Sequence, residues 1–168
     1  QVQTLVDAPC GDFNWMSEVV KKTKIRYIGL DIVDSIIAKN KKENERENIQ
    51  FQVADMCSDS IASCDILFVR DVLFHLSYRD IDRFLKNISK VDYKYLFTTT
   101  HLQTTKVTFK NSDIRSGDFR MIDLFKAPFH FPKNKVLEEV PDFIPGYPER
   151  SMVLIEKLNI PLSLNSFR

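Results

Sequence analysis

The chain has 168 residues, of which 28% are charged and 43% are hydrophobic. These values are typical of one globular domain with a single core, and they exclude a disordered or fibrous protein. The 24 basic and 23 acidic residues leave a net charge of +1, so nucleic acid is not indicated as a partner. No apolar run reaches the roughly 18 residues that a membrane-spanning helix needs.

The cysteines and the first residues of the sequence indicate the compartment. Cys10, Cys57 and Cys64 show neither the paired spacing of a zinc site nor an even set for disulfides. A basic segment followed by an apolar stretch, as in a signal peptide, is absent from the start of the sequence. We therefore expect a reducing, cytoplasmic compartment. Because the sequence begins with Gln1 rather than Met, we also expect that a native segment precedes it.

Strand-like and helix-like segments alternate in the first part of the chain. Apolar runs at 4–6, 25–30 and 49–54 predict three strands, and an aspartate follows each of them. The segments 13–22 and 34–47 between these strands have the length and composition of helices. This order of strands and helices is typical of a parallel sheet.

The next segments continue the pattern and then depart from it. The unbroken apolar run 65–69 predicts a strand that is buried on both faces, and 94–99 predicts a fifth strand. Between them, Ser77 and Asp80 resemble a capping box, and they precede apolar residues at helical spacing. Five prolines between 128 and 148 predict loops and short strands. A late strand follows at 151–156.

These elements predict a doubly wound, Rossmann-like α/β fold with a mostly parallel central sheet. We expect a single domain over 1–168, in which 1–100 form the cofactor-binding half. Residues 101–150 are expected to form loops that face the substrate, and 151–168 the last strand and a tail. In such folds ligands bind outside the carboxyl ends of the strands, so the residues that end strands are the candidate site.

The residues after the first three strands have the chemistry of a nucleoside site. Gly11 can take a positive φ in the turn after the first strand, and Asp7 can fix loop amides or receive a cation. Asp31 ends the second strand, where a carboxylate commonly accepts the hydrogen bonds of a ribose diol. Asp55 could accept an exocyclic amine between the apolar walls of Ile32 and Met56. The alternative is that these aspartates only cap loops.

At this point the chain resembles the class I S-adenosylmethionine-dependent methyltransferases. The first motif of that family, acidic and glycine-containing, resembles Asp7-Ala8-Pro9-Cys10-Gly11-Asp12-Phe13. The second and third motifs resemble Gly29-Leu30-Asp31 and Val53-Ala54-Asp55-Met56, and the segment after the fourth strand resembles Arg70-Asp71-Val72-Leu73-Phe74-His75-Leu76. The resemblance covers about residues 3–100.

The resemblance implies S-adenosylmethionine as the cofactor and assigns a role to each motif. Asp31 would hold the ribose hydroxyls and Asp55 the adenine amine, while the turn from Asp7 to Gly11 would hold the methionine portion. The implied cofactor-binding residues are Asp7, Ala8, Pro9, Cys10, Gly11, Asp31, Ile32, Asp55, Met56 and Arg70. The sequence departs from the family at Pro9 and Phe13, which stand where glycines are usual.

Two alternatives to this function remain open. A nicotinamide dehydrogenase is disfavoured, because the full Gly-x-Gly-x-x-Gly spacing that a pyrophosphate needs is absent. A noncatalytic module that binds an adenosyl ligand is less attractive, because all three strand ends keep their carboxylates.

The acceptor side is predicted from residues near the later strand ends. Methyl transfer to a hydroxyl needs positioning and a base, and the candidate catalytic residues are His101, His75 and Asp71. For His75, the alternative is an ordinary half-buried histidine that bonds to the backbone. Thr100 could orient a polar acceptor, and Arg115 or Arg120 could bind a carboxylate or phosphate.

Oxygen is the expected target, in a small molecule or a glycan. The Asn/Asp-Pro-Pro-aromatic sequence of many nucleic-acid amino methylases is absent. The alternatives are nitrogen methylation and methylation of a macromolecule. We expect no metal, because no compact ligand spacing is present.

Overall fold

A computed structural model describes residues 1–101, 108–142 and 144–164 of the chain. The elements in chain order are β1 (Thr4–Asp7), α1 (Asn14–Lys21), β2 (Arg26–Asp31), α2 (Asp34–Asn44), β3 (Ile49–Val53), β4 (Cys64–Val69), η1 (Leu73–His75), α3 (Tyr78–Ile88), β5 (Tyr93–His101), η3 (Lys133–Lys135), β6 (Val136–Pro141), β7 (Arg150–Glu156) and η4 (Lys157–Asn159). The predicted alternation of strands and helices up to β5 is confirmed.

The strands form one seven-stranded sheet in the order β3-β2-β1-β4-β5-β7-β6. Strands β1 to β5 pair in parallel, whereas β7 is antiparallel to both β5 and β6. The strand order reverses between β1 and β4, because the chain leaves β1 toward β2 and β3 and then returns. This reversal is the switch point at which doubly wound folds bind ligands, and the predicted fold class is confirmed.

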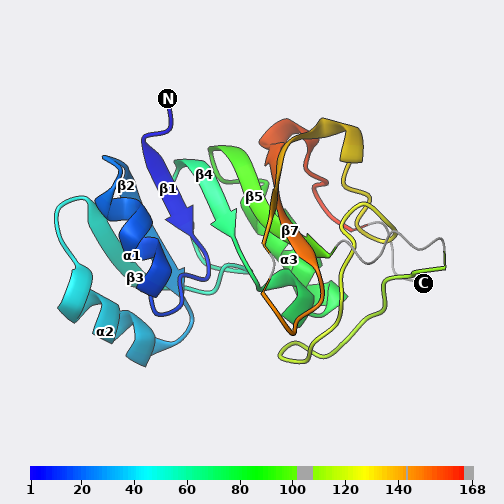
Figure 1. Ribbon diagram of the computed structural model, residues 1–168, viewed down its shortest axis with the longest axis horizontal. Helices are drawn as coiled ribbons and strands as arrows, with labels where there is room; N and C mark the ends of the chain where they lie inside the picture. Colours follow the sequence, from blue (N-terminus) through cyan, green and yellow to red (C-terminus); the bar gives the residue numbers. More distant parts are fainter. Residues whose placement is uncertain (102–107, 143, 165–168) are drawn as a thin grey trace.

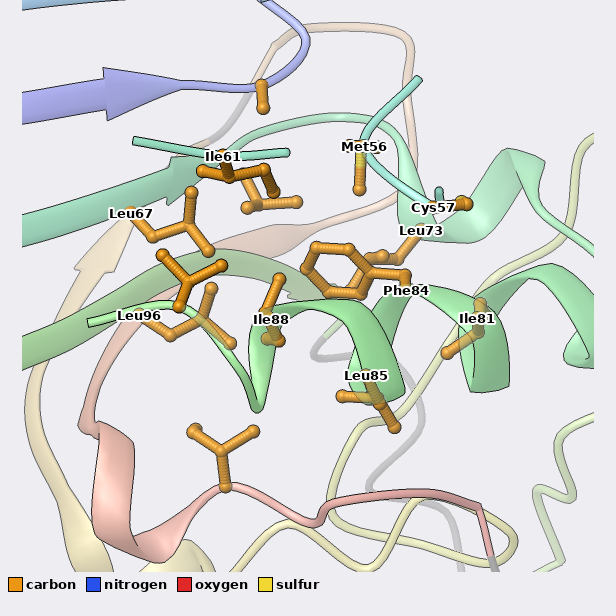
Figure 2. Packing of buried hydrophobic residues seen from close by; sticks show 14 of the residues in the cluster. Met56, Cys57, Ile61, Leu67, Leu73, Ile81, Phe84, Leu85, Ile88 and Leu96 are labelled. Atoms are coloured by element: carbon orange, nitrogen blue, oxygen red, sulfur yellow. The ribbon is translucent and has the colours of Figure 1, made fainter. Parts of the chain in front are cut away.

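The helices cover the two faces of the sheet (Figure 1). On one face, Met16 and Val20 of α1 and Ile37 of α2 belong to an apolar cluster with side chains of β1, β2 and β3. On the other face, the apolar side of α3 packs against β4 and β5, as Figure 2 shows for Ile88 and Leu96. The result is a sheet buried between helices, which explains why β4 is apolar without alternation.

Helix α3 begins as the sequence predicts. The Ser77 hydroxyl accepts a hydrogen bond from the Asp80 amide, so Ser77 is the N-cap. The buried residues of α3 are the apolar residues at the predicted helical spacing, namely Ile81, Phe84, Leu85 and Ile88. Helix α2 ends at Asn44, three residues before the predicted end.

The chain between β5 and β6 is mostly irregular. Over 108–132 the structure describes turns and irregular segments, in agreement with the predicted loops, and the prolines there are incompatible with a long helix. The predicted acceptor-facing range includes 102–107 and 143, and the predicted tail includes 165–168. These residues lie outside the described part of the chain. None of the described helices is both long and apolar enough to cross a membrane.

Candidate functional site

Two neighbouring cavities lie at the carboxyl ends of β1 to β4. The first cavity has a volume of about 300 Å³, and the second has a volume of about 240 Å³. Pro9 lines both. The predicted cofactor-binding residues are divided between them: Ala8, Pro9, Asp31, Ile32, Asp55 and Met56 line the first cavity, and Asp7, Pro9, Cys10, Gly11 and Arg70 line the second. The structure thus places all ten predicted cofactor-binding residues in these two neighbouring cavities.

The first cavity combines apolar walls with two carboxylates. Asp31, the last residue of β2, accepts hydrogen bonds from the amides of Gly11 at 3.1 Å and Val33 at 3.0 Å. An ionised carboxylate has about four acceptor sites, so Asp31 can accept further bonds from a ligand hydroxyl while it holds both loops in place. Loop capping and ligand binding are therefore compatible roles for this side chain.

Asp55 lies after β3 and organises its own turn. Its carboxylate accepts hydrogen bonds from the Cys57 amide and the Ser58 hydroxyl, both at 2.8 Å. Arg83 of α3 approaches the same carboxylate at 4.0 Å. Because each carboxylate oxygen accepts more than one bond, Asp55 retains capacity toward the first cavity, where it lies with Met56.

The turn after β1 is held against β2 and α2. A Cβ on Gly29 would lie 2.8 Å from the Phe51 ring and 3.0 Å from Cys10, so this close approach requires glycine. The buried Asn40 of α2 donates a hydrogen bond from Nδ2 to the Gly11 carbonyl at 2.7 Å. Asn40 was missed from the sequence, because it lies within a helix that reads as mostly polar and charged.

Phe13, one of the two departures from the family pattern, adopts the backbone conformation of a glycine. It is the N-cap of α1, with a φ of 57°, and it forms no side-chain cap. Its ring packs against Tyr27 at 4.8 Å and Phe51 at 5.0 Å. A left-handed conformation is costly for a bulky residue, and this aromatic packing offsets the cost.

The second cavity contains a buried acid. The Tyr27 hydroxyl donates a hydrogen bond to Asp7 Oδ2 at 2.7 Å. Burial raises the pKa of Asp7 to about 7, although the Tyr27 hydrogen bond and the charge of Arg70 oppose this shift. Burial also raises the pKa of the Cys10 thiol to about 12. Cys10 is therefore a protonated packing residue, and it is not a nucleophile.

Arg70 lines the second cavity and belongs to a ring of alternating charges. It contacts Asp142 with two hydrogen bonds of 3.0 and 2.9 Å, and Arg150 bonds both Asp142 and Asp71. Asp71 closes the ring at 3.4 Å from Arg70. The Arg70 guanidinium also lies 5.3 Å from the centre of the Trp15 ring. This ring of charges joins the end of β4 to the β6–β7 hairpin.

The charge ring bears on the predicted catalytic role of Asp71. Its carboxylate is paired with Arg150 at 2.9 Å and lies 3.4 Å from Arg70, so two guanidinium groups already engage it. The structure therefore assigns Asp71 to the charge ring. Asp142 and Arg150 were missed from the sequence, because nothing in their local pattern connects them to β4.

His75 has the geometry of an oriented base. Its Nδ1 lies 2.8 Å from the Asp118 carbonyl oxygen. Because a carbonyl can only accept, Nδ1 carries the hydrogen, and the neutral ring keeps its lone pair on Nε2. The His75 carbonyl in turn accepts a hydrogen bond from the Gly117 amide. The loop around 117–118 therefore fixes both the backbone and the ring of His75.

His101 has the opposite tautomer. The Ile122 amide donates to its Nδ1 at 3.2 Å, so the hydrogen of the neutral ring lies on Nε2. The side chain is 2% exposed, and burial, together with the charge of Arg150, lowers its pKa to about 4. Neither ring nitrogen is then suited to take a proton from an acceptor, and this geometry gives the predicted base role of His101 no support.

The predicted acceptor residues differ in their surroundings. Thr100 is fully buried, and its hydroxyl accepts a hydrogen bond from the Leu124 amide. The expectation that Thr100 orients an acceptor is therefore corrected, because this hydroxyl holds the neighbouring segment of the chain. Arg115 is exposed, whereas Arg120 is buried. Within the described part of the chain, no three side chains of His, Cys, Asp or Glu gather as a metal site.

Some lining residues received no role in the sequence analysis. Val72 and Leu76, on either side of η1, line the first cavity, and Trp15 and Phe68 line the second. Trp15 lies one residue into the first helix, at the carboxyl edge of the sheet. This position was the only sequence signal that could have identified Trp15 as a cavity-lining residue.

Comparison with known proteins extends these observations. Residues 5–92, slightly more than half of the chain, match the family model of a methyltransferase domain. No curated protein matches the sequence.

The fold is similar to that of several solved structures. One is the S-adenosylmethionine-dependent methyltransferase SibL in its apo form, with a TM-score of 0.68 and 12% identity over 93% of this chain and 50% of that chain. Another is the magnesium protoporphyrin IX methyltransferase ChlM of Synechocystis with bound SAH, with a TM-score of 0.67 and 11% identity over 92% and 74% of the two chains.

A third is an O-methyltransferase family 2 protein of Planctomyces limnophilus in complex with apigenin, with a TM-score of 0.69 and 15% identity over 92% and 50% of the chains. The present chain thus spans about half the length of two of these proteins, and at such low identities the likeness shows the fold. The family assignment comes from the sequence match, and the strand-end motifs agree with it. The chain belongs to the methyltransferase domain family, as its resemblance to the class I S-adenosylmethionine-dependent enzymes predicts.

Proposed function

We propose that the chain is an S-adenosylmethionine-dependent methyltransferase that methylates an oxygen of a small molecule or glycan. The observation that carries this proposal is the pair of cavities at the switch point of the sheet. One has two carboxylates among apolar walls, and the other has the Arg70 guanidinium together with three aspartates, Asp7, Asp12 and Asp71. This combination suits a ligand with a nucleoside at one end and an amino acid at the other.

The residues of the two cavities would hold the cofactor by complementary chemistry. Asp31 would accept the ribose hydroxyls and Asp55 the adenine amine, with Ile32 and Met56 as apolar walls. In the second cavity, Arg70 would attract the carboxylate of the amino acid. When bound, the cofactor supplies a methyl group on a sulfonium, which is already activated for displacement.

The protein must then position the acceptor and remove its proton. His75 is the base that the geometry supports best, because its Nδ1 hydrogen is held by the Asp118 carbonyl and its Nε2 lone pair is unprotonated in the neutral ring. In this proposal residues 1–100 hold the cofactor, and the loop around 108–131 faces the acceptor. A nitrogen acceptor or a noncatalytic adenosyl-binding role would appear in the experiments as binding without O-methylation.

The test is calorimetric titration of the chain with S-adenosylhomocysteine and with NAD. Asp31→Asn keeps the shape of the side chain and removes its charge, so it should weaken S-adenosylhomocysteine binding by about 1.5–3 kcal/mol. The control is Asp92→Asn, which removes an exposed carboxylate before β5. Equal affinities for the two variants would remove Asp31 from the site, and tighter binding of NAD would overturn the proposal.

A further inference from the structure

Arg120 is a buried cation that the proposed cofactor site does not use. The residue is 6% exposed, and within the described part of the chain none of its guanidinium nitrogens has a hydrogen-bond partner. A guanidinium has five N–H donors, and burial of a charge without hydrogen bonds or a counter-ion is costly. Buried arginines are normally paired, so this one calls for an explanation.

The surroundings of Arg120 contact its side chain but provide no hydrogen-bond acceptor for the guanidinium within the described part of the chain. Its guanidinium lies 5.0 Å from the centre of the Tyr78 ring, as in a cation–π contact. The nearby acid is Asp113, whose charge acts on Arg120. However, Asp113 Oδ1 accepts the amides of Tyr78 at 2.7 Å and Ile114 at 2.9 Å. This carboxylate caps the backbone, and no ion pair with Arg120 is formed in the described structure.

Arg120 is joined to the candidate base through the backbone. Its amide donates a hydrogen bond to the Phe74 carbonyl at 3.2 Å. Two residues earlier, the Asp118 carbonyl accepts the hydrogen of His75 Nδ1. The same short segment therefore carries the buried guanidinium and orients the ring of His75. The proposed function places the acceptor beside this segment.

We propose that Arg120 is the anion subsite of the acceptor, and that it binds a carboxylate or a phosphate group of the molecule to be methylated. The inference rests on the proposed function, which it deepens by naming the acceptor class as hydroxylated carboxylic acids or phosphate esters. An anion would give the guanidinium the two-pronged contact that it lacks. Within the described part of the chain no hydrogen bond uses the guanidinium donors, so all of them remain available to a ligand. Phe119 beside it is 52% exposed, so the segment borders solvent.

The first measurement separates a ligand-binding arginine from a structural one. Arg120→Gln should leave the thermal unfolding midpoint of the ligand-free protein unchanged or higher, because it removes an uncompensated buried charge. The matched control is Arg79→Gln, which removes an exposed arginine next to Tyr78. A large fall in the midpoint for Arg120→Gln alone would overturn the proposal, because it would show that the charge is already satisfied within the fold.

The second measurement uses inorganic phosphate and benzoate as probes, each titrated into protein saturated with S-adenosylhomocysteine. The wild type and Arg79→Gln should bind one of these anions, and Arg120→Gln should bind it about tenfold to a hundredfold more weakly. The preferred probe distinguishes a phosphate from a carboxylate acceptor. Arg120→Lys is the second variant: it keeps the charge and loses the planar contact, so it should also bind the anion more weakly than the wild type.

The outcomes separate this proposal from the proposed function. Failure of the wild type to bind S-adenosylhomocysteine would overturn the function itself. Normal binding of S-adenosylhomocysteine with no anion binding, or with equal anion binding by all variants, would overturn the anion subsite alone. A hydroxybenzoate and its neutral amide form a matched pair of acceptors. Methylation of the acid in preference to the amide, with that preference lost in Arg120→Gln, is the expected result.

Discussion

Asp7 and His101 are expected to act in opposite directions on the pH dependence of stability. Burial raises the pKa of Asp7 to about 7, so between its ordinary pKa of 3.8 and pH 7 the folded protein holds a proton that the unfolded chain has lost. Burial lowers the pKa of His101 to about 4. Between pH 4 and 6.5 the unfolded chain therefore holds a proton on His101 that the folded protein lacks.

The signs follow from the number of protons bound in each state. The contribution of Asp7 to the free energy of unfolding is fully present below pH 3.8 and is lost as the pH rises to 7, by about 1.4 kcal/mol per pH unit. The contribution of His101 rises over pH 4 to 6.5 at the same rate. The two slopes cancel in this window, so their combined effect on the wild-type profile is nearly flat there.

Two single variants make the separate pH dependences of Asp7 and His101 measurable. Asp7→Asn mimics the protonated acid and can still accept the Tyr27 hydrogen bond. His101→Asn places an amide oxygen near the position of Nδ1, where it can accept the Ile122 amide. Urea unfolding at several pH values gives the free energy of unfolding of each protein. The wild-type value is subtracted from the value of each variant at the same pH, and this difference removes the contributions of titrating groups that the proteins share. From pH 4.5 to 6, the difference should rise by about 2 kcal/mol for Asp7→Asn and fall by about 2 kcal/mol for His101→Asn.

A flat difference profile for Asp7→Asn would refute the reasoning for that residue. It would mean that Asp7 is ionised in the folded protein, with Arg70 and the Tyr27 hydroxyl outweighing burial. A flat profile for His101→Asn would show that the ring protonates with its ordinary pKa despite its contacts with Ile122 and Arg150. Difference profiles with slopes of the same sign in both variants would contradict the assignment. In that assignment the folded state binds the extra proton at Asp7, and the unfolded state binds it at His101.

Three further predictions follow from the site. His75→Ala should lower the methyl-transfer rate by roughly 10²–10⁴ and leave S-adenosylhomocysteine affinity unchanged, because a base acts on the acceptor alone; kinetics and calorimetry measure the two effects. Asn40→Ala should lower the free energy of unfolding by about 1–3 kcal/mol, since the Gly11 carbonyl loses its buried donor, and calorimetry should show weaker S-adenosylhomocysteine binding. Phe13→Gly should lower the free energy of unfolding by about 2–4 kcal/mol in urea titration, because the lost aromatic packing exceeds the relief of a left-handed backbone.

Each of these predictions has an outcome that contradicts it. A His75→Ala variant with full turnover on an identified acceptor would leave positioning as the main catalytic effect. Unchanged S-adenosylhomocysteine affinity in a destabilised Asn40→Ala variant would separate the fold of the turn from its binding role. A more stable Phe13→Gly variant would mean that the left-handed backbone costs more than the Phe13 ring contributes.

The cofactor side was predictable because its signal is local. Each aspartate follows an apolar strand within a few residues, and the carboxyl ends of parallel strands meet at one edge of the sheet. Asp7, Asp31 and Asp55 therefore had to lie near one another once the strands were assigned. The start of α3 was predictable for a similar reason, since Ser77 and Asp80 are three residues apart and form their capping contact without help from the rest of the fold.

The acceptor side depends on contacts between distant residues, and the sequence pattern does not record them. Asp142 bonds Arg70 across 72 residues of chain, and Arg150 bonds Asp71 across 79. The tautomers of the histidines are set in the same way, by Asp118 for His75 and by the Ile122 amide for His101. A histidine at a strand end is a reasonable candidate base, but its partner decides which nitrogen keeps a lone pair.

The unusual turn after β1 combines a local sequence signal with contacts between distant residues. Phe13 stands where a glycine is usual and takes the backbone conformation that favours glycine. Its ring packs on Tyr27, and the hydroxyl of that same tyrosine holds Asp7 in the second cavity. The side chain that stabilises the strained turn therefore also supports the hydrogen bond that opposes protonation of Asp7. Replacement of Phe13 should for this reason alter the charge of the cavity as well as the stability of the fold.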